Sequence, residues 1–293
     1  QATSAMLLAH DTPPMAKWLR SDTSSGLVAL SAHACPIVPG DLLYRHVWNQ
    51  VRGAVVTSAS LTSCGSFDYF LQEAGLNALA QVSTLAVDSP FDYATQGQLL
   101  VVETRADPRQ VDAYTQEMVA ALLDDLRQVG RGALVLFTSR VQMQAAVDAL
   151  DDGLRERVLV QGQLSRSRLL GSHLAGVDSG QPSVIFGMQS FGEGLDLPGK
   201  LCAHLFIAKL PFAPPDDPVG EARAEWLQAR GRNPFMELTV PATSVRLAQW
   251  AGRAIRTETD QAHIVCYDKR LITTQYGQRL LQGLPPFTQV RRD

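Results

Sequence analysis

The continuous apolar run at residues 133–137 (Ala-Leu-Val-Leu-Phe) limits the fold of this chain more than any other stretch. A strand with one solvent-exposed face alternates apolar and polar residues, whereas a strand buried on both faces is apolar throughout. A helical pattern follows at 141–150, and strand and helix patterns keep alternating along the chain. This alternation predicts an α/β fold, in which helices sandwich a parallel sheet through right-handed crossovers.

The other elements are predicted from apolar runs, helical periodicity and Gly or Pro breaks. Strands are expected at 27–30, 54–57, 99–103, 158–160, 183–186, 203–208 and 263–267. Helices are expected at 42–50, 67–75, 110–129, 166–175, 221–230, 243–256 and 273–281. Residues 1–25 and 209–218 are expected to be loops, while Asp41 and either Thr243 or Ser244 are expected to cap helices.

The composition allows a sizeable core and narrows the class of protein. Of the 293 residues 45% are hydrophobic, and the net charge of −3 argues against a uniformly basic nucleic-acid binder but allows a local basic groove. No apolar run approaches the ~20 residues that span a bilayer, so no membrane partner is expected. Free thiols indicate a reducing compartment, and a cytoplasmic protein is therefore expected. The cysteines lack zinc-site spacing, and buried free thiols and no metal site are expected. These cysteines are Cys35, Cys64, Cys202 and Cys266.

A basic stripe is predicted on the helix at 243–256. Residues four and seven apart share a helix face, so Gln249, Arg253 and Arg256 project together. Two arginines and a Gln suit a multiply charged anion such as a triphosphate. Gly252 inside this helix costs about 1 kcal/mol relative to Ala. An ordinary solvated helix face is an equally good explanation of the stripe. The stripe alone does not distinguish this explanation from an anion-binding site.

Polar residues follow several predicted strands where each strand ends. The carboxyl ends of parallel strands share one edge of a sheet, and ligands bind there. The Thr-Ser-Arg of 138–140 suits a phosphate contact or a helix N-cap, and the hydroxyls of 58–61 suit a site or a turn. The Gly-rich 192–196 suits a ribose, a metal, an arginine or a turn. His204 and His263 lie in apolar runs and are expected to be core histidines.

Taken in order, these motifs resemble one known series. Its members are Thr57-Ser-Ala-Ser-Leu61, Leu134-Val-Leu-Phe-Thr-Ser-Arg140, Leu159-Val-Gln-Gly162, Gln189-Ser-Phe-Gly-Glu-Gly-Leu-Asp196, Ile207-Ala-Lys-Leu-Pro-Phe212, Gln249-x-x-Gly-Arg-x-Ile-Arg256 and Tyr267-Asp-Lys-Arg-Leu271. The series resembles the carboxyl-terminal half of bacterial DinG-type DNA helicases, in the XPD-like branch of superfamily 2. The resemblance runs from about Leu27 to Phe287. Ser60 stands where the family pattern has Thr, and it keeps the hydroxyl.

The resemblance implies a motor of two RecA-like domains, with ATP and Mg²⁺ in the cleft between them and single-stranded DNA across their top. Residues 1–62 would be a remnant of the first motor domain, and residues 63–293 the RecA-like second domain. The whole protein would be an ATP-dependent 5′-to-3′ DNA helicase of DNA repair or replication, and the first motor domain would be a partner of this chain.

The resemblance also implies a role for each matching residue. Coupling of hydrolysis to DNA grip would fall to Thr57, Ser58, Ala59 and Ser60. Contact with the DNA backbone would fall to Thr138, Ser139, Arg140, Gln161, Gly162 and Ser190. The link between nucleotide and DNA would fall to Glu193, Gly194 and Asp196. The arginine-finger motif would be Gln249, Arg253 and Arg256, with both arginines reaching the γ-phosphate.

Three features of such helicases do not occur in this sequence: a GxxxxGK[ST] loop, an Asp-Glu-x-His box for Mg²⁺, and four clustered cysteines for an iron–sulfur cluster. The chain is therefore expected to be a piece of a longer protein and to lack ATPase activity by itself. A non-catalytic nucleic-acid-binding module with a RecA-like fold is the alternative. A nucleotide-binding domain of a metabolic enzyme is disfavoured, because no GxGxxG follows the first strand.

Overall fold

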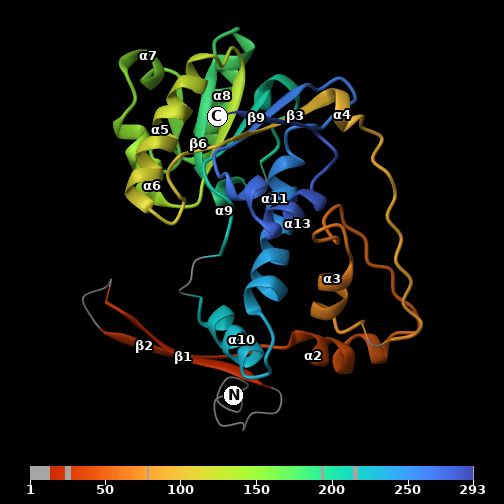
Figure 1. The fold of residues 1–293 in the computed structure, drawn as a ribbon. Coiled ribbons are helices and arrows are strands. Elements are labelled where there is room, and N and C mark those ends of the chain that lie inside the picture. Colours follow the sequence, from red (N-terminus) through yellow and green to blue (C-terminus); the bar gives the residue numbers. More distant parts are fainter. Residues whose placement is uncertain (1–13, 24–27, 78, 193–194, 214–216, 293) are drawn as a thin grey trace. The chain divides into compact units, whose positions relative to one another are not determined.

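The computed structural model divides the chain into two compact units (Figure 1). The residues that it describes are 14–23, 28–77, 79–192, 195–213 and 217–292. Unit 1 contains Gln1–Leu85 and Ala213–Ala242, and unit 2 contains Ala86–Phe212 and Thr243–Asp293. The boundary expected after residue 62 concerns the motor domain to which each segment belongs, and it stays a prediction.

Unit 2 is built, in the part that the structure describes, on a seven-stranded sheet whose neighbouring strands are all parallel. The strand order is β5-β6-β4-β7-β8-β3-β9. The strands are β3 (Gly97–Val102), β4 (Gly132–Phe137), β5 (Val158–Val160), β6 (Ser183–Met188), β7 (His204–Ile207), β8 (Ala262–Cys266) and β9 (Thr288–Arg292). The predicted α/β architecture is confirmed, and β9 is an additional edge strand that no apolar run announced.

Helices connect these strands and cover the sheet (Figure 1). They are α4 (Tyr93–Gln96), α5 (Val111–Arg127), α6 (Arg140–Asp148), α7 (Asp152–Arg155), α8 (Arg166–Asp178), α9 (Gln189–Gly192), η2 (Gly199–Cys202), α11 (Val240–Ala251), α12 (Arg270–Thr273) and α13 (Gln275–Gln282). The helix expected at 273–281 is split, because Thr274 is extended and caps α13 through Gly277 N.

The core of unit 2 lies on both faces of β4. Val135 and Phe137 belong to a buried cluster with residues of α5 such as Met118. Leu134 and Leu136 are equally buried, and they point to the opposite face because side chains alternate along a strand. The apolar run at 133–137 is therefore covered on both faces, as its sequence predicted.

His173 of α8 is the buried histidine that ties this helix to the sheet. Its Nδ1 lies 2.9 Å from Ser183 Oγ and its Nε2 lies 2.9 Å from the Leu201 carbonyl oxygen. Burial lowers the pKa of His173, because the charged form loses its hydration. The neutral imidazole is therefore the form that the fold favours.

Unit 1 contains an antiparallel hairpin and short helices. The elements are β1 (Met15–Asp22), β2 (Ala29–Pro36), α2 (Pro39–His46), η1 (Trp48–Gln50), α3 (Asp68–Glu73), α10 (Pro218–Gln228) and the π-helical turn η3 (Phe235–Thr239). The ion pair of Arg223 with Glu73 joins α10 to α3. Gly75 has φ +70°, and a Cβ on Gly75 would lie 2.2 Å from the Gly40 carbonyl oxygen, so α2 meets the end of α3 through bare backbone.

Several local predictions for unit 1 are wrong. The loop expected before residue 25 contains β1, whose hydrogen bonds come from β2, a partner that no local pattern reveals. The strand expected at 27–30 begins only at Ala29, and part of it lies outside the described residues. The strand expected at 54–57 does not form, because no neighbouring strand in the described part of the chain pairs with it.

The predicted helix starts also need correction. The N-cap of α2 is Val38, and Asp41 lies in the first turn, because Pro39 already begins the helix. Helix α11 begins at Val240, directly after η3, so Thr243 and Ser244 are buried inside it and do not cap it.

All four cysteines are free, but only two are buried. Burial raises the pKa of the Cys202 and Cys266 thiols to about 12, as expected for inert structural thiols. Cys35 and Cys64 are half-buried, so the expectation of four buried thiols is wrong for these two.

Candidate nucleic-acid interface and arginine turn

The carboxyl ends of β4, β5 and β6 form the first part of the candidate site. The Thr-Ser-Arg of 138–140 directly follows β4, and Arg140 is exposed at the start of α6. Ser139 occupies the N-cap position, but its side chain makes no capping hydrogen bond. The backbone of Ser139 therefore starts the helix, and the hydroxyl is not used for that purpose. This arrangement leaves a hydroxyl and a guanidinium at the strand end.

Gln161 and Gly162 follow β5 at the same edge of the sheet. The Gln161 side-chain oxygen accepts a hydrogen bond from Met188 N at 2.7 Å, which ties the end of β5 to the end of β6. Gly162 is exposed with φ +95°, a conformation that favours glycine and turns the chain toward α8. The hydrogen bond from Met188 N thus gives Gln161 a structural role that the sequence pattern did not predict.

The carboxyl ends of β7 and β8 are tied together by a buried carboxylate. Asp268 is fully buried, accepts the Leu210 amide at 3.2 Å, and pairs with the Arg270 guanidinium at 2.6 Å. Lys209 Nζ donates to the Pro108 carbonyl oxygen at 2.7 Å, and burial lowers the pKa of Lys209. The cations at this end of the sheet therefore support the fold.

The segment between β6 and β7 crosses from the carboxyl edge of the sheet to the amino edge. Asp196 is exposed, whereas Leu195 is buried and its carbonyl oxygen accepts a hydrogen bond from Arg253 Nη1 at 2.6 Å. Glu193 and Gly194 lie outside the described residues, as does the side chain of Ser190. The predicted roles of these three residues stay predictions.

The predicted helical stripe of Gln249, Arg253 and Arg256 is wrong for its two arginines. Helix α11 ends at Ala251, and Gly252 begins a non-helical segment that we call the arginine turn, residues 252–260. Gln249 is exposed on the last turn of the helix. The arginines lie beyond the helix end, so their directions follow from the turn and not from helical periodicity.

Asp260 organises the arginine turn. Its carboxylate accepts the Arg256 amide at 2.7 Å, the Thr257 amide at 2.9 Å and the Thr257 hydroxyl at 2.5 Å. Burial acts to raise the pKa of Asp260, but the hydrogen bonds from Thr257, Arg256 and Gly199 together outweigh burial and lower this pKa. Arg256 itself is exposed. The turn therefore fixes the backbone of Arg256 and presents its side chain to solvent.

The arginine turn lies at the amino edge of the sheet. Gln96 immediately precedes β3, and its Nε2 donates to the carbonyl oxygens of Thr257 at 3.0 Å and Asp260 at 3.1 Å. Gly199, just before β7, lies against the Asp260 side chain. The predicted DNA-contacting residues and the predicted arginine motif thus occupy opposite edges of one sheet.

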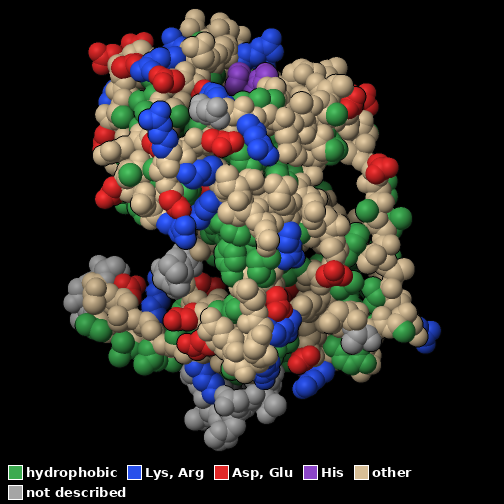
Figure 2. All heavy atoms as spheres, viewed as in Figure 1, with side chains coloured by type: hydrophobic (Ala, Val, Ile, Leu, Met, Phe, Trp, Pro, Cys, Tyr) green, Lys and Arg blue, Asp and Glu red, His purple; other side chains and the backbone are tan. Residues whose placement is uncertain are grey.

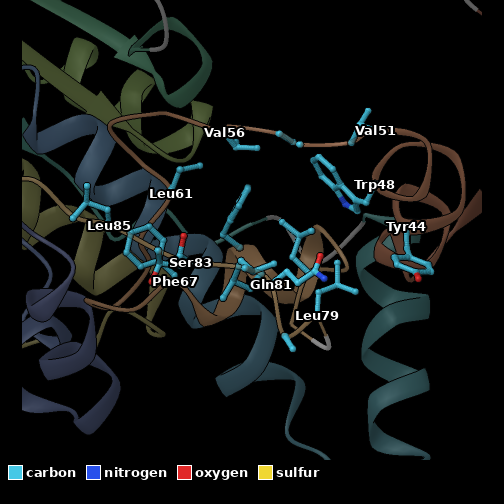
Figure 3. A pocket seen from close by; sticks show the side chains of 18 of the residues that line it. Tyr44, Trp48, Val51, Val56, Leu61, Phe67, Leu79, Gln81, Ser83 and Leu85 are labelled. Atoms are coloured by element: carbon cyan, nitrogen blue, oxygen red, sulfur yellow. The ribbon is translucent and has the colours of Figure 1, made fainter.

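The predicted coupling segment belongs to unit 1. The Ser60 amide donates to Ser58 Oγ at 3.2 Å, so a hydroxyl turn follows the extended residues 54–57. Val55 of this segment is 92% exposed. The segment also borders a cavity of about 680 Å³. Figure 3 shows Val51 and Val56 along one rim of the cavity and Leu79 and Gln81 along the other.

His204 and His263 are not core histidines. They are paired across β7 and β8 at the amino ends of these strands, with ring centroids 5.3 Å apart. His263 is exposed and His204 is half-buried. Burial, followed by the neighbouring His263, lowers the pKa of His204. Both residues lie in apolar runs of the sequence, so the pattern does not indicate that they occupy the solvent-accessible amino ends of β7 and β8.

Neither a metal cluster nor a membrane span is found in the part of the chain that the structure describes. No group of three or more His, Cys, Asp or Glu side chains there converges to hold a metal ion. Among the same described residues, no helix combines the length and the apolar character needed to cross a bilayer.

Some residues of the candidate site lie outside the predicted set. Arg166 and Arg168 are exposed at the start of α8, close to the ends of β5 and β6. Their signal was the Ser-Arg-Ser-Arg run shortly after Gly162. Asp260 and Gln96 were missed because their importance arises from contacts between segments that are distant in sequence.

The parallel sheet, the polar carboxyl edge and the arginine turn define a RecA-like domain of the helicase kind. The sequence profile described as "Helicase C-terminal domain" matches residues 122–287, more than half of the chain. The chain belongs to this helicase C-terminal domain family.

Curated relatives confirm the resemblance to DinG-type helicases. The chain is 37% identical over 283 residues to the ATP-dependent DNA helicase DinG of Photobacterium profundum, an alignment covering 94% of this chain and 40% of the relative. It is 39% identical over 277 residues to DinG of Salmonella typhimurium, covering 94% of this chain and 39% of the relative. The chain thus spans about 40% of the length of these relatives.

Solved XPD structures share the fold. A structure of apo XPD has a TM-score of 0.52 and 20% identity, and the match covers 68% of this chain and 40% of that chain. A structure of the XPD helicase has a TM-score of 0.51 and 19% identity, with 67% and 35% of the two chains covered. At this identity the likeness concerns the fold alone.

Proposed function

We propose that this chain supplies the second motor domain of an ATP-dependent DNA helicase that moves 5′ to 3′ in DNA repair or replication. The observation that carries the proposal is the separation of the two predicted sets of residues on opposite edges of one sheet. A motor domain needs one face for the nucleic acid and another for the nucleotide. The names of the DinG relatives support the activity of the whole protein.

The proposed DNA-binding edge is the carboxyl edge of β4, β5 and β6. Arg140 supplies a planar, permanently charged donor for phosphate oxygens, and Thr138 and Ser139 supply neutral hydroxyl donors. Gln161 keeps the ends of β5 and β6 together through Met188 N. Contacts of this kind recognise the sugar-phosphate backbone and carry no sequence preference of their own.

The proposed nucleotide-facing group is Arg256. Its amide is held by Asp260 and its side chain is exposed, so the guanidinium is anchored at one end and available at the other. A guanidinium directed at a γ-phosphate stabilises the charge that develops during hydrolysis, which contributes roughly 10³- to 10⁵-fold in known examples. Arg253 binds the Leu195 carbonyl oxygen, so we assign it a positioning role between the arginine turn and the segment before β7.

The first motor domain is the proposed partner, and it would hold most of the ATP and the Mg²⁺. No converging group of metal-ligating side chains lies in the described part of this chain. The dispersed cysteines, two of them buried at the ends of η2 and β8, do not fit an iron–sulfur cluster. We derive no step through such a cluster.

The exposed segment 54–57, which belongs to the predicted remnant of the first motor domain, is the proposed docking strand for the rest of that domain. Apolar side chains of this segment are exposed to water: Val55 is 92% exposed and Val56, which lines the neighbouring cavity, is 44% exposed. Pairing with a strand of the first motor domain would cover Val55 and satisfy the extended backbone. The hydroxyl turn with Ser58 and Ser60 would then lie at the end of that strand, where a coupling role becomes possible.

The test of this proposal is ATP hydrolysis with and without single-stranded DNA, measured on this chain and on the complete protein that contains it. The chain alone should not hydrolyse ATP above background, because it supplies only the arginine side of the nucleotide site. The complete protein should show DNA-stimulated hydrolysis. Robust DNA-stimulated hydrolysis by the chain alone would refute the assignment to a second motor domain.

A further inference from the structure

We propose that Arg166 is a further phosphate-binding residue for single-stranded DNA, and that Phe191 positions it. The inference rests on the proposed function, since it concerns the same DNA-binding edge. Arg166 lies outside the motif series, and three observations support this role: its cation–π contact with Phe191, the packing that fixes Phe191, and the exposed cations around it.

The first observation is a cation–π contact. Arg166 is exposed at the first position of α8, and its guanidinium carbon lies 5.5 Å from the centre of the Phe191 ring. Such a contact holds the guanidinium near the ring and restrains a side chain that otherwise loses much rotamer freedom on binding. The N–H donors lie in the plane of the guanidinium, and two of them match the spacing of phosphate oxygens. Arg166 is therefore partly pre-organised to bind an anion.

The second observation is that Phe191 is itself held in place. It belongs to α9, directly after β6, and it is only 6% exposed. Its ring packs on Gly187 of β6, where an added Cβ would lie 2.9 Å from Phe191 Cδ1. Only glycine at position 187 allows this packing without a shift. The ring is thus a rigid support for Arg166.

The third observation is the character of the surrounding edge. Phe137 at the end of β4 pairs with Met188 at the end of β6, so Arg140 follows a strand adjacent to the one that leads to Phe191. Arg140, Arg166 and Arg168 are all exposed. Figure 2 shows Lys and Arg side chains gathered in the region of α9.

The cations at the ends of β7 and β8 hold the fold together. Lys209 and Arg270, after β7 and β8, are engaged with a backbone carbonyl oxygen and a buried carboxylate. Lys269 donates to the carbonyl oxygens of Thr104 and Arg105. The exposed arginines therefore concentrate around β4, β5 and β6. A chain of phosphates that follows this part of the edge would meet Arg140 and Arg166 without any base-specific group.

The test is the affinity of the chain for a fluorescent oligo(dT) strand, measured by anisotropy at several salt concentrations. Arg166→Ala should weaken binding about tenfold, as expected for the loss of charged hydrogen bonds. It should also reduce the salt slope by about 0.7, the value for one phosphate contact on a single strand. Arg131→Ala is the matched control. It removes the same charge as Arg166→Ala, but Arg131 is exposed just before β4, at the amino edge of the sheet.

Two further variants separate positioning from charge. Arg166→Lys should keep the salt slope and lose only part of the affinity, because Lys retains the charge without the planar fork. Phe191→Leu should weaken binding, and adding Arg166→Ala to it should cause less additional loss than Arg166→Ala alone. Such non-additivity reports a shared contact. Circular dichroism of the Phe191 variant checks that it remains folded, and Gly187→Ala provides a second way to displace the ring.

The outcomes distinguish this inference from the proposed function. If Arg166→Ala matches Arg131→Ala while Arg140→Ala weakens binding, the role of Arg166 is wrong and the proposed DNA-binding edge stands. If Arg166→Ala and Phe191→Leu act additively, the positioning role of Phe191 is wrong. If the unchanged chain does not bind oligo(dT) at low salt, both the inference and the DNA-binding edge are overturned.

Discussion

Replacing Asp260 by Ala should remove the support of the arginine turn. Asp260 is 5% exposed, and it accepts the amides of Arg256 and Thr257 and the Thr257 hydroxyl at 2.5–2.9 Å. Each hydrogen bond to a charged group contributes about 1.5–3 kcal/mol. Arg256 and Thr257 are exposed, so water replaces part of each lost bond. We therefore expect the free energy of unfolding to fall by about 3 kcal/mol, and not by the full sum.

Urea unfolding and amide hydrogen exchange measure the two effects. The unfolding experiment should give the expected loss at pH 7, and the amides of Arg256 and Thr257 should lose protection in Asp260→Ala. Glu258→Ala is the control, because Glu258 is an exposed carboxylate in the same turn. Surface changes of this kind usually alter stability by less than about 0.5 kcal/mol.

The same variant tests the electrostatic account. The hydrogen bonds lower the pKa of Asp260 from its ordinary value of 3.8. A lowered folded-state pKa contributes stability that is fully present above this ordinary value and is lost as the pH falls through the folded-state pKa. Asp260→Ala should lack that part of the acid dependence. Equal stability of Asp260→Ala and Glu258→Ala at pH 7, with unchanged exchange at both amides, would refute the reasoning.

Two further predictions concern stability. Lowering the pH from about 7 to about 5.5 should reduce the free energy of unfolding, because His173 has a lowered pKa in the folded chain and the unfolded chain takes up a proton first. His173→Gln should reduce this dependence of the unfolding free energy on pH. An unchanged pH dependence in urea titrations would contradict the account. Gly75→Ala should cost more than about 2 kcal/mol, since its Cβ would collide with the Gly40 carbonyl oxygen. Gly231→Ala, also at φ +70° but with open space around it, should cost about 1 kcal/mol; equal losses in thermal unfolding would exclude the collision.

The parallel sheet could be predicted from sequence because its central strands are apolar on both faces. The run at 133–137 indicates a doubly covered strand whatever its neighbours are. Edge strand β9, by contrast, pairs only with β3 and carries a polar sequence, so no burial pattern marks it. The opposite error concerns 54–57, whose β-forming residues predict a strand, because a strand also needs a neighbouring strand to pair with.

The candidate site was predictable as a set of residues and not as a geometry. Order and spacing identified 138–140 and the arginines of 253–256, and these segments do lie at the edges of the sheet. The predicted helix extends to residue 256, whereas α11 ends at Ala251, because the helical periodicity continues past Gly252 although glycine there favours a helix end. The position of the arginines at the amino edge depends on Gln96 and Asp260, and local sequence patterns do not report such long-range hydrogen bonds.

The most direct test of the central claim is DNA-stimulated ATP hydrolysis by the complete helicase carrying Arg256→Ala, with the dissociation constant for single-stranded DNA measured in parallel. The account predicts that hydrolysis falls by at least about 10³-fold, because the guanidinium at the amino edge is lost. The dissociation constant should change by no more than about threefold, because the DNA contacts lie at the opposite edge. A similar loss of DNA affinity and hydrolysis, or hydrolysis that persists, would contradict the assignment of the two edges.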